Sequence, residues 1–176
     1  MDIIIRKINS QDARQYIKLK TLVWRDAYKH IFPEEVFIDM EEKEEQKIKD
    51  FNKNYFNDDT KINYVAELNG NIIGLFMGRI DSGYHYFNEK GFADLEALYI
   101  HPNYQGLGIA NRFKKIFIDW LINRNKTKYV IGVLKENKKA RIIYEKWGGM
   151  LDDYSQKYVK LNNFYDEVFY TYEIDK

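Results

Sequence analysis

The sequence contains no cysteine and only two prolines among its 176 residues. Without cysteine the chain has no disulfide framework, no thiolate metal site and no cysteine nucleophile. No apolar run approaches the roughly 18 residues of a membrane-spanning helix, and the N-terminus lacks the basic and apolar regions of a signal peptide. We therefore expect a cytoplasmic protein without a membrane partner.

The composition is typical of a folded domain. Hydrophobic residues make up 45% of the chain and charged residues 31%, and we see no repeat or linker. We therefore predict a single domain over residues 1–176. The net charge is 28 − 27 = +1, which argues against a nucleic-acid partner.

The charges are unevenly distributed along the chain. Residues 34–59 hold ten acids and four bases, a net charge of −6, and residues 112–146 hold eleven bases and three acids, a net charge of +8. These segments can face partners of opposite charge. Solvated helix faces explain the same pattern, so the charges alone leave both interpretations open.

Hydrophobic spacing and turn residues predict the order of secondary structure. We expect strands at 3–8, 62–68, 72–80, 92–100 and 129–134, and two more around Asn162-Asn163 within 150–174. We expect helices at about 9–28, 34–50, 109–121 and 137–147. Asn69-Gly70 predicts a hairpin turn, and residues 82–90 a polar loop.

This order predicts a mixed α/β domain. The segment 92–134 has the strand–helix–strand pattern of a parallel crossover, and the remaining strands follow one another as antiparallel neighbours. The sheet should thus be mostly antiparallel with one parallel pair, with helices on both of its faces.

The most informative stretch is a glycine turn between a strand and a helix. It reads Gln105-Gly106-Leu107-Gly108-Ile109-Ala110. Glycines let the backbone approach a ligand closely, and a helix N-terminus offers free N–H donors to an anion. The turn therefore suits a diphosphate, although a simple chain reversal would need the same glycines.

A second segment follows the strand at 129–134. It reads Asn137-x-x-Ala140-Arg141-x-x-Tyr144-x-x-Trp147-Gly148. Asn137 can cap the helix or bind a ligand amide. Tyr144 lies on the apolar stripe, where a tyrosine is more often part of the core than a catalyst.

At this spacing the two segments together resemble the GNAT superfamily of acyl-CoA-dependent N-acetyltransferases. The resemblance also includes Leu98-Tyr-Ile-x-Pro102 and covers residues 60–174 in order and motif. It implies an acetyl-CoA-binding core at 92–149 and a variable, acceptor-side helical region at 1–60. Gly148-Gly149 departs from the Gly-Phe of many members, and Ala110 stands where many have glycine.

The resemblance implies a set of site residues and a sheet that splays at its parallel pair. Backbone of the first parallel strand would pair with pantetheine, the glycine turn would hold the pyrophosphate, and Asn137 would meet pantetheine from the second strand. Tyr144 would donate a proton to the leaving thiolate, and no metal takes part. The cofactor-binding set is Leu98, Tyr99, Ile100, Gln105, Gly106, Leu107, Gly108, Ile109, Ala110, Asn137, Ala140 and Tyr144.

The general base is expected on the strand at 92–100. Asp94 and Glu96 alternate onto one face of that strand, and either carboxylate could accept the amine's proton, directly or through water. We prefer Glu96, because the family often has glutamate near this position. Attack would be direct within a ternary complex.

The acceptor is a primary amine, and a small cationic amine is the leading expectation. The acidic helix at 34–50 could attract it, and Trp24, Tyr28, Phe32 and the loop 82–90 could line its pocket. A protein N-terminal or lysine acetyltransferase and a non-catalytic CoA-binding sensor remain alternatives. The tyrosine-rich C-terminal sheet edge could also pair with a second copy to form a homodimer.

Overall fold

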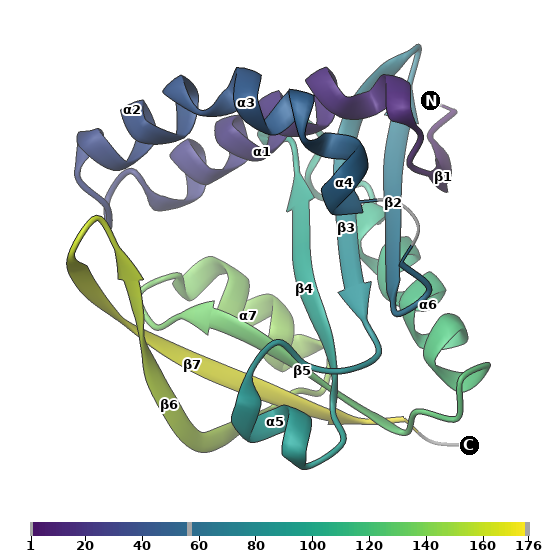
Figure 1. Cartoon of the computed structure of the whole chain (residues 1–176). Helices are drawn as coiled ribbons and strands as arrows, with labels where there is room; N and C mark the ends of the chain where they lie inside the picture. Colours follow the sequence, from purple (N-terminus) through teal and green to yellow (C-terminus); the bar gives the residue numbers. More distant parts are fainter. Residues whose placement is uncertain (1, 56–57, 175–176) are drawn as a thin grey trace. The chain divides into compact units, whose positions relative to one another are not determined.

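The structure, a computed structural model, describes residues 2–55 and 58–174. Figure 1 shows its helices and strands. The strands are β1 (Ile4–Lys7), β2 (Lys61–Leu68), β3 (Asn71–Arg79), β4 (Ala93–Ile100), β5 (Lys128–Leu134), β6 (Met150–Lys160) and β7 (Asn163–Glu173). The α-helices are α1 (Ala13–Tyr28), α2 (Glu34–Glu42), α3 (Glu44–Lys49), α4 (Phe51–Tyr55), α5 (His85–Glu89), α6 (Ile109–Ile122) and α7 (Lys138–Lys146). Short 3-10 helices are η1 (Ser10–Asp12) and η2 (Pro102–Tyr104).

The strands pair in the order β1-β2-β3-β4-β5-β7-β6. β4 and β5 are parallel, with Ala93 opposite Tyr129 and Asp94 opposite Val130. β5 pairs with β7 along its whole length, and that pair, β6–β7 and β1–β2 are antiparallel. The mixed sheet and its single crossover, β4-α6-β5, confirm the predicted fold class.

The chain forms two compact units, and the first comprises the residues up to Met77 together with Ala97–Ile116. Helix α1 covers one face of its strands, where Tyr16 and Ile17 join a buried cluster with Val65 and Leu75. On the other face, α6 packs through Phe113, whose ring centroid lies 5.5 Å from that of Phe76. Each such fully buried side chain contributes about 1.5–3 kcal/mol.

The second unit comprises Gly78–Glu96 and the chain from Phe117 onward. On one face of its strands, Phe87 of α5 packs with Val130 and Phe169 in a buried cluster. On the other face, Tyr129 stacks on Tyr172 at 4.4 Å and meets the edge of Phe117 from α6. The prediction of one domain over 1–176 remains a prediction.

Two expected elements differ from the structure. The acidic helix at 34–50 is divided into α2 and α3, and the chain turns after Asp50 so that Phe51 of α4 packs against Tyr16. The loop 82–90 contains the short helix α5, which places the fully buried Phe87 in the core of the second unit.

Both predicted hairpins are present. Asn69 and Gly70 have φ of 50° and 77°, the left-handed pair that a tight hairpin turn requires. The C-terminal turn uses Leu161 and Asn162, with φ of 45° and 62°. It therefore lies one residue earlier than the Asn162-Asn163 pair that the sequence indicates.

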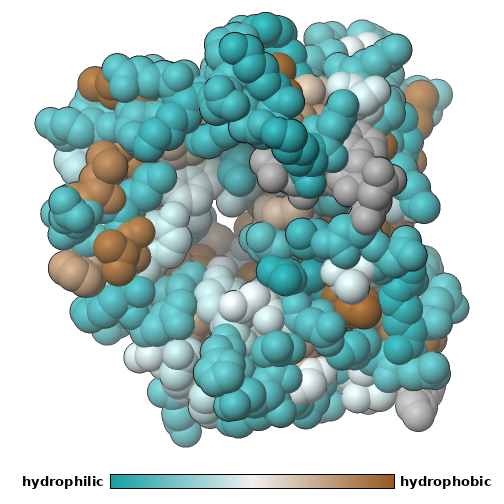
Figure 2. Space-filling view, viewed as in Figure 1, coloured by the Kyte–Doolittle hydropathy of each residue, from teal (hydrophilic) through white to brown (hydrophobic). Residues whose placement is uncertain are grey.

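The surface is mostly hydrophilic on the face shown in Figure 2, where hydrophobic residues form small separate patches. The most exposed large hydrophobic residues lie on the β6–β7 hairpin, and they include Met150, Val159 and Phe164. Among the residues that the structure describes, no helix is both long and apolar enough to cross a bilayer.

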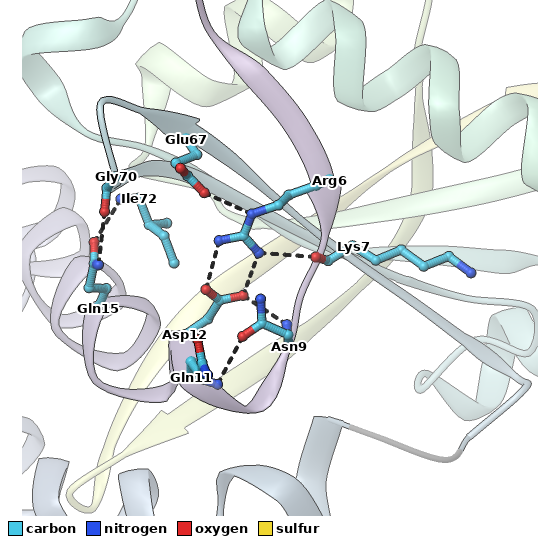
Figure 3. Close-up of polar contacts among 9 residues, drawn as sticks. All are labelled: Arg6, Lys7, Asn9, Gln11, Asp12, Gln15, Glu67, Gly70 and Ile72. Atoms are coloured by element: carbon cyan, nitrogen blue, oxygen red, sulfur yellow. Dashed lines mark hydrogen bonds and ion pairs between the residues drawn. The ribbon is translucent and has the colours of Figure 1, made fainter.

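A polar network anchors the start of α1 to the sheet (Figure 3). Arg6 of β1 donates two hydrogen bonds to Asp12, at 2.7 and 2.8 Å, and a third to Glu67 of β2. Asp12 also accepts from the backbone N–H of Asn9 and completes a capping box. Gln15 then bridges α1 to the β2–β3 turn at Gly70 and Ile72.

Replacing Asp12 with asparagine should destabilise the fold. Burial raises the pKa of Asp12, but the hydrogen bonds from Arg6 and Asn9 outweigh burial and lower it below its ordinary value. The Asp12 contribution is therefore present above the unfolded pKa of about 3.9 and is lost as pH falls through the lower folded pKa. We expect Asp12→Asn to cost about 2–3 kcal/mol in urea unfolding at pH 7.

The exposed Asp153 provides a matched control. Asp153→Asn makes the same chemical change and should leave the free energy of unfolding within about 0.5 kcal/mol of the wild type. Equal effects of the two substitutions at pH 7 would contradict an anchoring role for Asp12.

Candidate active site

Strand β4 contributes residues to both units. In the second unit, Asp94 lies opposite Val130 of β5, which packs with Phe87 of α5. In the first unit, Tyr99 packs against the α1 cluster, and its hydroxyl accepts a hydrogen bond from the indole of Trp24.

Asp94 is almost completely buried, with 2% of its surface exposed. Its Oδ2 atom accepts hydrogen bonds from the backbone N–H of Gly83 at 3.2 Å and from the Ser82 hydroxyl at 3.4 Å. Within the described residues, Oδ1 has no hydrogen-bond partner. Burial raises the pKa of Asp94 to about 7, against the opposing effect of the Gly83 N–H.

Two charged neighbours adjust this pKa in opposite directions. Glu96, which is exposed, raises the pKa of Asp94, and the guanidinium of Arg79 lowers it. The backbone of Gly83 lies against both groups, since a Cβ there would be 3.2 Å from Arg79 Nη1 and 3.7 Å from Asp94 Oδ2. The result is a carboxyl group that can take up and release a proton near neutral pH.

The glycine turn lies in the first unit and links β4 to α6. Gln105 donates from its side chain to the carbonyl of Ile100 at 3.3 Å. Gly106 and Gly108 have φ of 77° and 76°, and a Cβ at either glycine would meet open space. Both glycines are therefore needed for the backbone path.

Helix α6 begins directly after this turn. Arg112 makes the first helical hydrogen bond, to the carbonyl of Gly108. The N–H groups of Ile109 and Ala110 thus belong to the first turn, where the helix itself supplies no carbonyl acceptor. This arrangement fits the phosphate-binding role that the sequence predicts for Gln105–Ala110.

The predicted pantetheine strand comprises Leu98, Tyr99 and Ile100, all half-buried. The Tyr99 hydroxyl accepts a hydrogen bond from the indole of Trp24 at 2.9 Å, and Trp24 stacks on Phe32. Trp24 and Phe32, two of the aromatic residues that the sequence assigns to the acceptor side, are therefore fixed to β4 within the first unit.

Asn137, Ala140 and Tyr144 lie on or next to α7 in the second unit. The Asn137 side chain accepts a hydrogen bond from the N–H of Ala140 at 3.2 Å, so Asn137 is an N-cap. Its amide NH₂ group can still donate to a ligand. Tyr144 is half-buried with Ala140, and its carbonyl accepts from the hydroxyl of Tyr172 at 2.9 Å.

The acidic helices hold much of their charge in ion pairs. Arg25 of α1 bonds to both Glu34 and Glu41, Arg14 bonds to Glu45, and Lys43 pairs with Asp39. These carboxylates thus attach α2 and α3 to α1 or stabilise α2 itself. The expected acidic surface for attracting a cationic acceptor is correspondingly weaker in the structure.

Sequence reasoning missed the residues that hold Asp94. Ser82, Gly83 and Arg79 follow no motif, and only the fold brings them to β4. Glu167 of β7 was also missed, although the acid pair Asp166-Glu167 inside an aromatic-rich C-terminal strand was a signal. In the described part of the chain, no three acidic or histidine side chains converge as a metal site would need.

Residues 21–149 match the model of the acetyltransferase (GNAT) family, which is more than half of the chain. The chain belongs to this family. Membership confirms the resemblance drawn from the two motifs. It also confirms the enzyme class and the acetyl-CoA cosubstrate expected from it.

Solved structures of similar fold support the architecture. The PaiA N-acetyltransferase of Thermoplasma acidophilum, solved with coenzyme A, shares 20% identity over 95% of this chain and 98% of its own, with a TM-score of 0.71. The ribosomal-protein-S18-alanine N-acetyltransferase of Escherichia coli shares 17% identity over 99% and 96%, with a TM-score of 0.68. At this level of identity the comparison shows the fold.

Replacing Gly108 with valine should weaken acetyl-CoA binding. A β-branched residue at φ of 76° strains the turn and displaces the N–H groups that follow it. We expect the Kd for acetyl-CoA, measured by calorimetry, to rise at least about tenfold, because about 1.4 kcal/mol of lost interaction is sufficient.

Gly70 is a close control, because it has φ of 77° and equally open surroundings in the β2–β3 turn. Gly70→Val should lower stability by a similar amount without changing the Kd. A normal Kd in Gly108→Val would rule out the turn as the phosphate site.

Proposed function

We propose that this acetyltransferase moves the acetyl group of acetyl-CoA to a primary amine, and that a small cationic amine is the acceptor. The amine would attack directly within a ternary complex, which accords with a sequence without cysteine. The observation that carries the proposal is the buried carboxyl of Asp94, whose pKa of about 7 suits proton removal from an ammonium.

In the first unit, we assign cosubstrate binding to the β4 backbone and the glycine turn. Leu98, Tyr99 and Ile100 would pair with pantetheine as a neighbouring strand does. Gln105–Ala110 would bind the pyrophosphate through main-chain N–H groups. The two left-handed glycines and the first turn of α6 support this assignment.

In the second unit, Asn137 would donate its amide NH₂ to pantetheine beside Ala140. Lys138 and Lys139 follow on the first turn of α7, and both are exposed. Cations at a helix N-terminus oppose the helix dipole, so helix stability does not explain them. Attraction to the phosphates of the cosubstrate would explain these two lysines. The same attraction would explain the positive charge of the basic segment 112–146.

We assign the role of general base to Asp94, and the proton would pass to its unpartnered Oδ1 directly or through a water. Glu96, two residues along β4 and exposed, would pass the proton on to solvent. The sequence favours Glu96 as the base, whereas burial favours Asp94. Burial raises the pKa of a carboxyl group, and a higher pKa lets the carboxylate compete for the proton of an ammonium.

Acetyl-CoA supplies a thioester whose carbonyl oxygen gains negative charge during attack. A backbone N–H near Leu98–Tyr99 would stabilise that charge. Tyr144 would donate its phenolic proton to the leaving thiolate, since a phenol with a pKa of about 10 is protonated at neutral pH. The N-cap at Asn137 and the bond from Tyr172 fix the backbone of α7 around Tyr144.

The cytoplasmic location and the homodimer expected from the sequence remain predictions. The place of β6 at the end of the strand order, with Leu151 and Val159 exposed, supports a contact with a second copy.

The Asp94 assignment predicts a specific pH profile. In the wild type, kcat/KM should rise as pH increases through about 7, because only the ionised Asp94 accepts a proton. Asp94→Asn should lower kcat/KM by about 10²–10⁴-fold and abolish this inflection. The control Glu96→Gln should retain it, and loss of the inflection in Glu96→Gln alone would make Glu96 the base.

Stability measurements distinguish a catalytic effect from misfolding. Because the folded pKa of Asp94 is raised, the folded state loses stability as pH rises from about 4 to 7. Asp94→Asn should therefore melt at or above the wild-type temperature at pH 8.

Tyr144 is tested by removing its hydroxyl. Tyr144→Phe should lower kcat by about 10²-fold or more while the Kd for acetyl-CoA stays within about twofold. Tyr158→Phe, on the half-exposed edge strand β6, is the matched control and should leave both constants unchanged. Unchanged kcat in Tyr144→Phe would remove Tyr144 as the proton donor.

A further inference from the structure

A second buried carboxylate lies in the second unit, away from every motif. Glu167 of β7 is 6% exposed. Its Oε1 atom accepts a hydrogen bond from the hydroxyl of Tyr84 at 2.9 Å, and its Oε2 atom accepts from the side-chain amide of Gln156 at 2.8 Å. Both donors are neutral, so they orient the carboxylate without cancelling its charge.

Within residues 2–55 and 58–174, no cation pairs with Glu167. Lys157 of β6 and Lys135, which follows β5, both pair with the neighbouring Asp166 instead. Buried acids are usually paired with a cation, because removing an ion from water costs several kcal/mol. The Glu167 carboxyl is therefore oriented by two neutral donors and has no ion pair among the described residues.

Gly132 of β5 makes room for this arrangement. A Cβ at Gly132 would lie 2.3 Å from the Tyr84 hydroxyl oxygen and 3.1 Å from Glu167 Oε1. The Tyr84 ring meets Phe169 edge-on, with centroids 4.6 Å apart. The absence of a side chain at 132 thus allows the hydroxyl to reach Glu167, and the aromatic contact fixes its position.

The Glu167 site is connected to Asp94 through one short segment. The N–H of Tyr84 donates to the Ser82 hydroxyl, which in turn donates to Asp94. On the strands, Val130 lies opposite Asp94, and Gly132 lies two residues further along the same face, about 6–7 Å away. An unpartnered, buried carboxylate oxygen of Asp94 is therefore on the same sheet face as Glu167.

We propose that Glu167, oriented by Tyr84, binds a second ammonium group of the acceptor while Asp94 serves the amine that reacts. The acceptor class is then a short aliphatic diamine or polyamine, with one ammonium group for each carboxylate. This inference rests on the proposed acetyl transfer to an amine. It adds a residue that determines specificity by binding and takes no part in proton transfer.

Acetylation of 1,4-diaminobutane and of butylamine tests the inference, because the two probes differ in one ammonium group. The wild type should prefer the diamine by at least about tenfold in kcat/KM, as expected for a charged partner in a buried site. Glu167→Gln should bring the ratio to within about twofold of one, chiefly through KM for the diamine. Tyr84→Phe, which removes the orienting hydroxyl, should also lower the ratio.

Asp166→Asn is the matched control, since it removes one negative charge at the adjacent position of β7. It should preserve the preference, whereas an equal loss in both variants would mean that general charge, and not Glu167, attracts the diamine. Retention of the preference in Glu167→Gln would overturn the inference.

A thermal-shift assay keeps the inference separate from the proposed function. With acetyl-CoA present, 1,4-diaminobutane should stabilise the wild type more than butylamine, and this difference should vanish in Glu167→Gln. Equal shifts by the two amines overturn the Glu167 site alone. No shift by acetyl-CoA and no acetylation of any amine overturn both proposals.

Discussion

Burial of the Asp94 carboxyl is the constraint on which the second unit depends. Removing that group from water is costly, so the surrounding chain must supply partners. The segment from Ser82 to Tyr84 supplies them, and Ser82 is itself tied back to Phe92 by a backbone hydrogen bond of 2.9 Å. Helix α5 follows this segment, and its Phe87 is buried in the cluster with Phe169. The packing of that aromatic cluster therefore determines the surroundings of the Asp94 carboxyl.

In the first unit the predicted phosphate site depends on backbone geometry. The turn at Gln105–Ala110 needs two left-handed glycines and a helix start, and strand β4 is anchored by the hydrogen bond between Tyr99 and Trp24. The buried charge of this unit, at Asp12, is neutralised by Arg6. Under the proposed function the two units divide the chemistry, because one would offer oriented N–H groups to the cosubstrate and the other would offer carboxylates and a phenol for proton transfer.

Local patterns predicted most of the fold, because its elements follow from spacing and turn residues. Gly106 and Gly108 were identified because glycines let the backbone approach a ligand closely, and the Asn69-Gly70 turn because that pair is typical of a tight hairpin. Alternation placed Asp94 and Glu96 on one face but could not reveal that Asp94 is buried and Glu96 exposed. That difference arises from Ser82, Gly83 and α5, which are brought to β4 by tertiary packing. The network at Glu167 depends on contacts 83 residues apart, between Tyr84 and β7.

Helix α3 has no fully buried side chain. Its Ile48 is only partly buried against the α1 cluster, and Glu45 is held to Arg14 of α1 by an exposed ion pair. Exposed pairs contribute little free energy and weaken as salt screens them. Helix α3 therefore has a lower cost of local opening than the sheet beneath α1. Amide hydrogens of α3 would exchange with solvent while those of β2 and β3 stay protected. Under the proposed function, with this segment on the acceptor side, it would adapt to differently shaped acceptors without loss of the folded core.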